Sequence, residues 1–122
     1  MPMIDPHVMS DEEIFISSVN QIASQVNSWA HGRGFYDRET PRTFAEEIAL
    51  MHSELSEALE ADRHGNPPDD HIPDFSGMEA ELADCIIRIF DTCVERKLRL
   101  AEAILAKMDY NDGRPYKHGK AY

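Results

Sequence analysis

Four carboxylates at two short spacings are the residues of this sequence best suited to chemistry. Glu54 and Glu57 stand three positions apart in HSELSEALEADR, and Glu81 and Asp84 stand three positions apart in EAELADCIIRIFD. Residues three apart share one face of a helix, so each pair presents two acids side by side. Several uncompensated anions in a partly buried cleft would be very costly. Hard divalent cations such as Mg²⁺ and Mn²⁺ prefer oxygen ligands, so we expect these four side chains to form a metal site.

The competing interpretation is a solvated acidic helix face. Glutamate is a good helix former, and a glutamate-rich face usually needs no ligand. Arg88 can pair with Asp84 one turn earlier, and Asp91 extends the same face. A single acid pair would favour this alternative, whereas two pairs on consecutive helices, each beside an apolar stripe, favour the metal site. No HExxH, Cys/His or Glu-x-x-His spacing indicates a zinc or di-iron centre.

Four helices are predicted to position these acids. Ser10, Thr43 and Ser76 each begin a capping box, in which a glutamate follows three residues after the cap. No segment alternates with period two for long enough to be a strand. The sequence therefore predicts an all-α, antiparallel four-helix bundle-like domain, with helices over 11 to about 31, 44 to about 63, 77 to about 96, and about 100 to 110.

The two central helices carry apolar stripes that are expected to face the core. The spacing of three and four residues places large apolar side chains on one face of each helix. The stripe of the second helix comprises Phe44, Ile48, Met51, Leu55 and Leu59, and that of the third comprises Leu82, Ile86, Ile89, Phe90 and Cys93.

The acid motifs and their surroundings resemble a known family. ELSE at 54–57 and ELAD at 81–84 are similar to the ExxE and ExxD signature of the MazG-like, all-α nucleoside triphosphate pyrophosphohydrolases. WAHGRGFYD, EEIALMHSELSEALEADR, EAELADCIIRIFD and KMDYNDGRPYKHGK follow one another in the order typical of short single-domain members, including phage-encoded ones. The resemblance covers about residues 20 to 120.

This resemblance implies an activity and a set of ligands. The family reaction is NTP + H₂O → NMP + pyrophosphate, and the four acids hold Mg²⁺, for which Mn²⁺ is expected to substitute. By position, Glu54, Glu57, Glu81 and Asp84 become the metal ligands and the catalytic acids, with Glu54 or Glu57 orienting or deprotonating the attacking water. The resemblance also favours deoxynucleotides, purines such as dGTP or dATP among them, and a homodimer or homotetramer.

A basic segment near the C-terminus is expected to bind phosphates. Lys107 and Asn111 share a helix face, and the resemblance implies that they face the nucleotide. Arg114, Lys117 and Lys120 follow just beyond, where lysine offers a point charge and arginine a planar fork. For these last three residues, a loose basic tail is an equally good interpretation.

The first predicted helix is unusual because it carries no formally charged residue from Ile14 to Gly32, in a chain that is 29% charged. Asn20 and Gln21 have neutral amides that can read the edge of a nucleobase, and Trp29 or Phe35 could stack on the base. The alternatives are a buried subunit interface for the helix and a core position for Trp29.

Length and composition bound the class of protein. The chain has 122 residues, 42% of them hydrophobic, which suits one domain over 1–122, with an N-terminal extension at 1–10 and a basic tail at 111–122. Its net charge of −11 argues against binding to DNA or RNA polymers. The lack of a long apolar run, of a signal peptide and of an evident disulfide between Cys85 and Cys93 predicts a cytoplasmic protein without a membrane span. The alternative to an enzyme is a non-catalytic acidic helical module that binds a protein partner.

Overall fold

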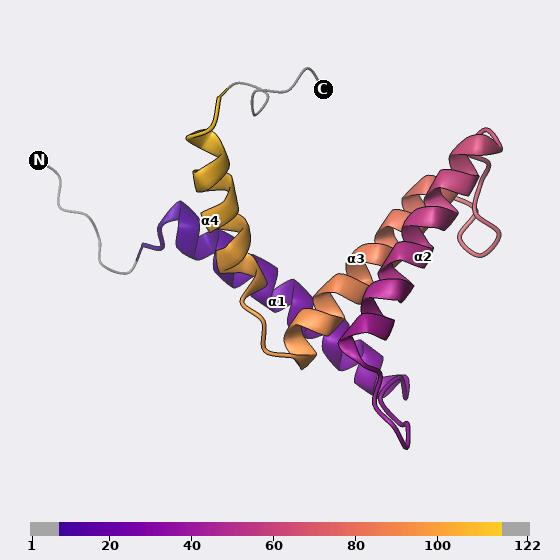
Figure 1. Ribbon diagram of the computed structural model, residues 1–122, viewed down its shortest axis with the longest axis horizontal. Coiled ribbons are helices and arrows are strands. Elements are labelled where there is room, and N and C mark those ends of the chain that lie inside the picture. Colours follow the sequence, from indigo (N-terminus) through magenta and orange to yellow (C-terminus); the bar gives the residue numbers. More distant parts are fainter. Residues whose placement is uncertain (1–7, 116–122) are drawn as a thin grey trace, which may run out of the picture.

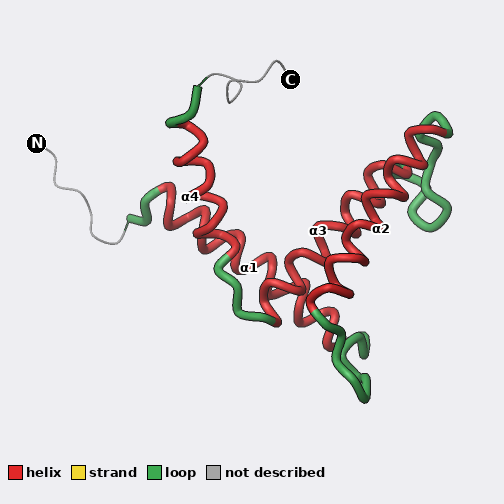
Figure 2. The backbone as a smooth tube through the Cα atoms, viewed as in Figure 1, coloured by secondary structure: helices red, strands yellow, loops and turns green. Residues whose placement is uncertain are grey.

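The computed structural model describes residues 8–115, and these are helical with short loops (Figures 1 and 2). The four helices are α1 (Asp11–Gly32), α2 (Phe44–Arg63), α3 (Gly77–Glu95) and α4 (Leu100–Asp112). The only β-type pairing in this range is an isolated bridge between Pro68 and Ser76. The predicted all-α class is therefore confirmed, and each helix boundary falls within two residues of its predicted position. None of the helices described has a stretch long and apolar enough to cross a membrane.

The predicted caps explain where the helices begin. At the starts of α1 and α3, the serine side chain accepts from the backbone N–H of a glutamate, whose carboxylate accepts in return from the serine backbone: Ser10 pairs with Glu13 and Ser76 with Glu79. At the start of α2, the hydroxyl of Thr43 accepts from the backbone N–H of Glu46, but the return bond to the Glu46 carboxylate is not formed, so only half of the predicted capping box is present. These contacts satisfy backbone donors that would otherwise be left over in the first helical turn.

α2 and α3 form an antiparallel pair, which is the part of the fold that matters for the acids (Figure 1). The beginning of α2 meets the end of α3, where Arg96 donates to Glu47 over 2.8 Å. The end of α2 meets the beginning of α3, where a Cβ on Gly77 would lie only 2.9 Å from the Cβ of Ala61. Glycine at 77 therefore allows the two helices to approach more closely than any larger residue would.

α1 crosses the end of this pair, and α4 lies mainly along α1. Asn27 and His31 on α1 bond to Asp91 and Glu95 on α3, which holds the last turns of both helices together. Figure 1 shows α4 beside the first half of α1, away from the far end of the α2–α3 pair. Within one chain, α4 therefore does not cover the middle of α2 or α3.

The expected apolar core is only partly covered. The buried hydrophobic residues of the described range are small: Ala23, Ala30, Ala80, Cys85 and Ala101. Five residues of the predicted core stripes are about half exposed instead: Phe44 (47%), Leu55 (47%), Leu59 (51%), Leu82 (48%) and Ile86 (51%). The core assignment of these five was wrong for the single chain, because helical spacing shows which face is apolar but not whether anything covers it.

Candidate functional site

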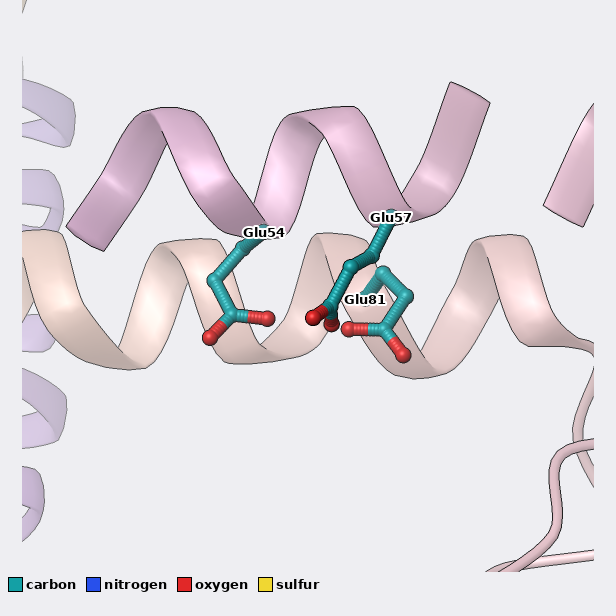
Figure 3. A group of neighbouring side chains, drawn as sticks. All are labelled: Glu54, Glu57 and Glu81. Carbon is teal, nitrogen blue, oxygen red and sulfur yellow. The ribbon is translucent and has the colours of Figure 1, made fainter. Parts of the chain in front are cut away.

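Three of the four predicted metal ligands come together between α2 and α3. Glu54 and Glu57 from α2 and Glu81 from α3 each contribute one carboxylate oxygen to a group whose members all lie within 4.8 Å of one another. Figure 3 shows the three side chains gathered on one side of the helix pair. We call Glu54, Glu57 and Glu81 the carboxylate cluster. The antiparallel packing of two i, i+3 acid pairs therefore brings together three of the four predicted ligands.

Glu54 is the most buried member of the cluster. It is 7% exposed, whereas its apolar neighbour Leu55 is 47% exposed, so the usual preference for burying the apolar residue is reversed here. Its charge is balanced by Arg88, whose Nε donates to Glu54 Oε1 over 3.0 Å. The pairing of Arg88 with Asp84 that the competing interpretation offered is not formed, because Arg88 reaches across to the neighbouring helix rather than back along its own.

Glu81 shows most clearly that the cluster lacks positive charge. Its Oε2 atom is buried without a hydrogen-bond partner. Burial raises the pKa of Glu81 to about 8. The nearby carboxylates of Glu57 and Glu54 contribute, because they can accept a hydrogen bond from the protonated form and repel the ionised form. Two ionised carboxylates can only accept hydrogen bonds, so they can bond to each other only when one of them carries a proton. At neutral pH the metal-free cluster therefore holds a proton that a bound cation would replace.

Asp84, the fourth predicted ligand, lies at the rim of the cluster. It is exposed and stands outside the group of three whose oxygens converge. Burial raises its pKa, as do the negative charges of Glu54 and Glu57, while the positive charge of Arg88 acts in the opposite direction. The charges of the cluster therefore affect the pKa of Asp84, although its oxygens are not among those that converge.

The composition of the cluster fits a hard divalent cation. It offers carboxylate oxygens and no sulfur or imidazole, which suits Mg²⁺ or Mn²⁺ better than a softer metal. The buried Oε2 of Glu81 has no donor, so a cation there would satisfy an atom that is otherwise costly to bury.

A cavity of about 360 Å³ reaches the cluster through Arg88, the ion-pair partner of Glu54, although none of the cluster residues lines it. It is formed by the loop after α1, the first half of α2 and the last half of α3, and Arg88 belongs both to its wall and to the ion pair with Glu54. The wall is mostly charged, with four arginines and three acids, and it also has two aromatic rings. It comprises Phe35, Tyr36, Arg38, Pro41, Arg42, Glu47, Leu50, Arg88, Asp91, Thr92, Glu95 and Arg96. A cleft of this volume and chemistry can hold a small organic anion.

One side of the cavity is held in place by a polar network. Asn27 donates to Asp91 over 2.9 Å, and His31 bonds to Glu95 over 2.8 Å. The ring of Tyr36 stacks on His31 with centroids 4.2 Å apart. Burial raises the pKa of Tyr36, and so does hydrogen bonding to Asp91, so its hydroxyl remains a neutral donor.

Sequence reasoning did not identify this cavity as a site. The available signal was the continuation of the acid spacing along α3, since Glu81, Asp84, Arg88, Asp91 and Glu95 recur every three or four residues on one face. The loop residues Tyr36 and Arg38 gave no comparable signal, because their position depends on how the loop folds over that face.

The predicted base-contacting residues lie on α1. Asn20 and Gln21 are exposed and do not line the cavity. Trp29 is 50% exposed, and its ring meets Phe35 of the cavity wall edge-on, with centroids 5.3 Å apart. Trp29 also borders a shallow apolar hollow formed with Gln25, Val26 and Ile87. Phe35, the other predicted stacking residue, lies in the loop after α1 and lines the cavity directly, and Trp29 is connected to the cavity through it.

The described phosphate-contacting candidates, Lys107, Asn111 and Arg114, lie away from the carboxylate cluster in the single chain. Lys107 and Asn111 belong to α4, and Arg114 follows it. The ammonium of Lys107 lies 5.2 Å from the centre of the Tyr110 ring. Lys117, and Lys120 beyond it, lie outside the described residues. Since α4 packs mainly on α1, one chain does not bring Lys107, Asn111 or Arg114 to the carboxylate cluster (Figure 1). The phosphate contacts of all five residues stay predictions.

Comparisons of the chain with protein-family models, with curated proteins and with solved structures found no match.

Proposed function

We propose that this protein is a divalent-metal-dependent nucleoside triphosphate pyrophosphohydrolase of the MazG-like kind, which converts NTP and water to NMP and pyrophosphate. The observation that carries the proposal is the convergence of Glu54, Glu57 and Glu81 around a buried oxygen that has no donor, beside a cavity with four arginines. A triphosphate and its cation need both features, an acidic site for the metal and a cleft with arginine and aromatic side chains for the nucleotide.

Within this proposal, the residues of the chain have separate roles. Glu54, Glu57 and Glu81 hold the cation, and Asp84 completes the ligand set from the rim. A bound Mg²⁺, or Mn²⁺ in its place, supplies a Lewis acid that offsets the triphosphate charge and activates water for attack on the α-phosphorus. Glu54 or Glu57 accepts the proton of that water.

The cavity provides the nucleotide end of the site. Its volume of about 360 Å³ suits a nucleobase with its sugar. Phe35 and Tyr36 offer aromatic faces for stacking, and the carboxylates of Asp91 and Glu95 can accept from amino groups on a base. The preference for deoxynucleotides, dGTP or dATP among them, belongs to the proposal through the family resemblance.

We include a homodimer or homotetramer in the proposal. Leu55, Leu59, Leu82 and Ile86 form a half-exposed apolar surface on the α2–α3 pair, and a second copy would cover it. A second copy would also account for Asn20, Gln21, Lys107 and Asn111, which could then approach the site of a neighbouring chain rather than their own.

A screen of canonical and modified nucleoside triphosphates with pyrophosphate detection tests the function. Wild-type protein with Mg²⁺ should release pyrophosphate, and Glu54→Gln should not. Glu46→Gln is the matched control, because it removes an exposed acid from the same helix outside the cluster and the cavity. A protein that neither binds Mn²⁺ nor releases pyrophosphate would instead favour the non-catalytic interaction module.

The same screen tests the base contacts. Asn20→Ala and Gln21→Ala should change the ranking of accepted bases if α1 lines the base site of a neighbouring chain. An unchanged ranking in both variants would remove these two residues from the site while leaving the carboxylate cluster unaffected.

A further inference from the structure

Arg88 differs from the other cavity arginine that forms an ion pair with α2. Arg88 and Arg96 have nearly the same side-chain exposure, 35% and 34%, and each pairs with a glutamate of that helix. The two arginines differ in how many contacts hold the guanidinium in place.

Arg96 is held by several contacts at once. Its Nε and Nη2 donate to both oxygens of Glu47, Nη2 also donates to the carbonyl of Arg42, and the guanidinium lies 5.3 Å from the centre of the Phe44 ring. This two-pronged pairing fixes both the position and the plane of the guanidinium. Arg96 is therefore a fixed part of the cavity wall.

Arg88 is held by one hydrogen bond. Only its Nε donates, to Glu54 Oε1 over 3.0 Å, and within residues 8–115 its two terminal nitrogens have no hydrogen-bond partner. A guanidinium has five N–H donors, so most of the capacity of Arg88 is unused. Because the side chain also lines the cavity, these donors are available to a ligand there.

The carboxylate that Arg88 contacts is a member of the cluster. Glu54 is the buried acid of the group, and Arg88 is the only base that forms an ion pair with the cluster in the described part of the chain. A divalent cation among the three carboxylates would stand close to the guanidinium and would repel it. The same carboxylate therefore serves either the arginine or the cation more favourably than it serves both.

We propose that Arg88 is an exchangeable counter-ion, which neutralises Glu54 in the metal-free protein and moves to an anionic group in the adjoining cavity when a divalent cation occupies the carboxylate cluster. This inference rests on the proposed function, in which the base and sugar occupy the cavity and the anionic group is the phosphate chain at the Arg88 end of it. Arg88 would then couple the two sites. The anionic group draws Arg88 away from Glu54, which favours the cation, and the cation displaces Arg88 from Glu54, which favours the anionic group. The coupling free energy must be the same in both directions.

The exchange predicts opposite effects on the two ligands when the charge of Arg88 is removed. In Arg88→Met, Mn²⁺ binding without nucleotide should tighten about fivefold or more, since the competing cation is gone and couplings of this kind span about 5- to 150-fold. Binding of a non-hydrolysable α,β-methylene triphosphate at saturating Mg²⁺ should weaken about ten- to hundred-fold, as expected for loss of a hydrogen bond to a charged group.

Mn²⁺ binding is measured by the electron paramagnetic resonance signal of the free ion, under nitrogen and at pH 8.5 for every variant. Arg96→Met is the matched control: it removes a guanidinium from the same cavity wall, but its Mn²⁺ affinity should stay within about twofold of wild type because its partner Glu47 is outside the cluster. Arg88→Lys keeps the charge without the planar fork and should give intermediate values for both ligands.

A structural role for Arg88 would have a different result. If Arg88 only clamped α3 to α2, Arg88→Met would weaken Mn²⁺ and nucleotide binding together and lower the melting temperature, and that outcome would overturn the proposal. Unchanged Mn²⁺ affinity or unchanged analogue binding would overturn it as well. If Arg88→Met does not fold, Arg88→Gln carries the same test, because its amide can still donate to Glu54 without a charge.

Failure of this inference can be told from failure of the proposed function. The Mn²⁺ titration needs no nucleotide, so it reports on Arg88 even if the protein hydrolyses no triphosphate. A wild-type protein that hydrolyses triphosphates, combined with an Arg88→Met variant whose Mn²⁺ affinity is unchanged, would leave the function in place and remove the exchange.

Discussion

Binding of a divalent cation to the carboxylate cluster should release a proton from Glu81. Burial and the neighbouring carboxylates raise the pKa of Glu81 to about 8, so this carboxyl is protonated at neutral pH in the metal-free protein. A carboxylate must be ionised to coordinate a metal, so the cation and the proton compete for the same group.

The size of this effect follows from the pKa. With a pKa of about 8, the carboxyl is about 90% protonated at pH 7 and about 10% protonated at pH 9, so metal binding should release about 0.9 and about 0.1 proton respectively. The apparent affinity for Mn²⁺ should rise about fifty-fold from pH 6 to pH 8 and about twofold more above that.

Titration calorimetry measures the released proton directly. Mn²⁺ is titrated into the protein in two buffers of different ionisation enthalpy, and the difference in heat gives the number of protons. Glu46→Gln, outside the cluster, should behave as wild type. Affinity that is flat from pH 6 to pH 8, with no proton released at pH 7, would refute the electrostatic description of the cluster.

The same shift has a consequence for stability without metal. A carboxyl whose pKa is higher in the folded protein than the ordinary 4.5 stabilises the fold below about pH 4.5, and this contribution is lost as the pH rises through about 8. Glu81→Gln cannot ionise, so relative to wild type it should gain stability as the pH rises over this window. Equal melting temperatures of the two proteins from pH 5 to pH 8.5 would contradict the assignment.

Three further predictions concern other parts of the molecule. Lys107→Met should lower kcat/KM about ten- to hundred-fold on every accepted base, because a phosphate contact does not read the base; a changed base preference with an unchanged rate on the best substrate would place Lys107 at the base instead. Light scattering at tens of micromolar should show at least a dimer, since five large apolar residues of α2 and α3 are about half exposed in one chain; a monomer would reject this. Gly77→Ala should destabilise the protein by about 1–3 kcal/mol, because its Cβ would lie 2.9 Å from the Cβ of Ala61; Ala61→Gly added to it should restore most of the loss in urea unfolding, and no loss in the single variant would argue against the close helix approach.

Local chemistry explains why much of the fold could be predicted from the sequence. The capping boxes at Ser10 and Ser76 act over three residues, so their effect on the helix starts can be read directly from the chain. The convergence of Glu54, Glu57 and Glu81 needed only one further assumption, that consecutive helices pack antiparallel.

The features that could not be predicted from the sequence depend on packing between elements. Arg88 had a plausible partner in Asp84 on its own helix, but the ion pair forms with Glu54 across the α2–α3 contact, which no local spacing reports. Leu82 and Ile86 lie on an apolar face as predicted, yet they remain about half exposed, because periodicity does not identify the surface that covers a face. The cavity could not be predicted either, because its wall combines the loop at Tyr36 with two helices, and their relative positions depend on tertiary packing.

The position of bond cleavage tests the central claim most directly. Hydrolysis of an accepted nucleoside triphosphate is run with Mg²⁺ in ¹⁸O-labelled water, and the products are analysed by mass spectrometry. Attack at the α-phosphorus should place one labelled oxygen in the nucleoside monophosphate and none in the pyrophosphate, and turnover should be lost in Glu54→Gln but not in Glu46→Gln. Release of orthophosphate and a nucleoside diphosphate, or turnover that persists in Glu54→Gln at saturating Mg²⁺, would contradict the proposed reaction and its site.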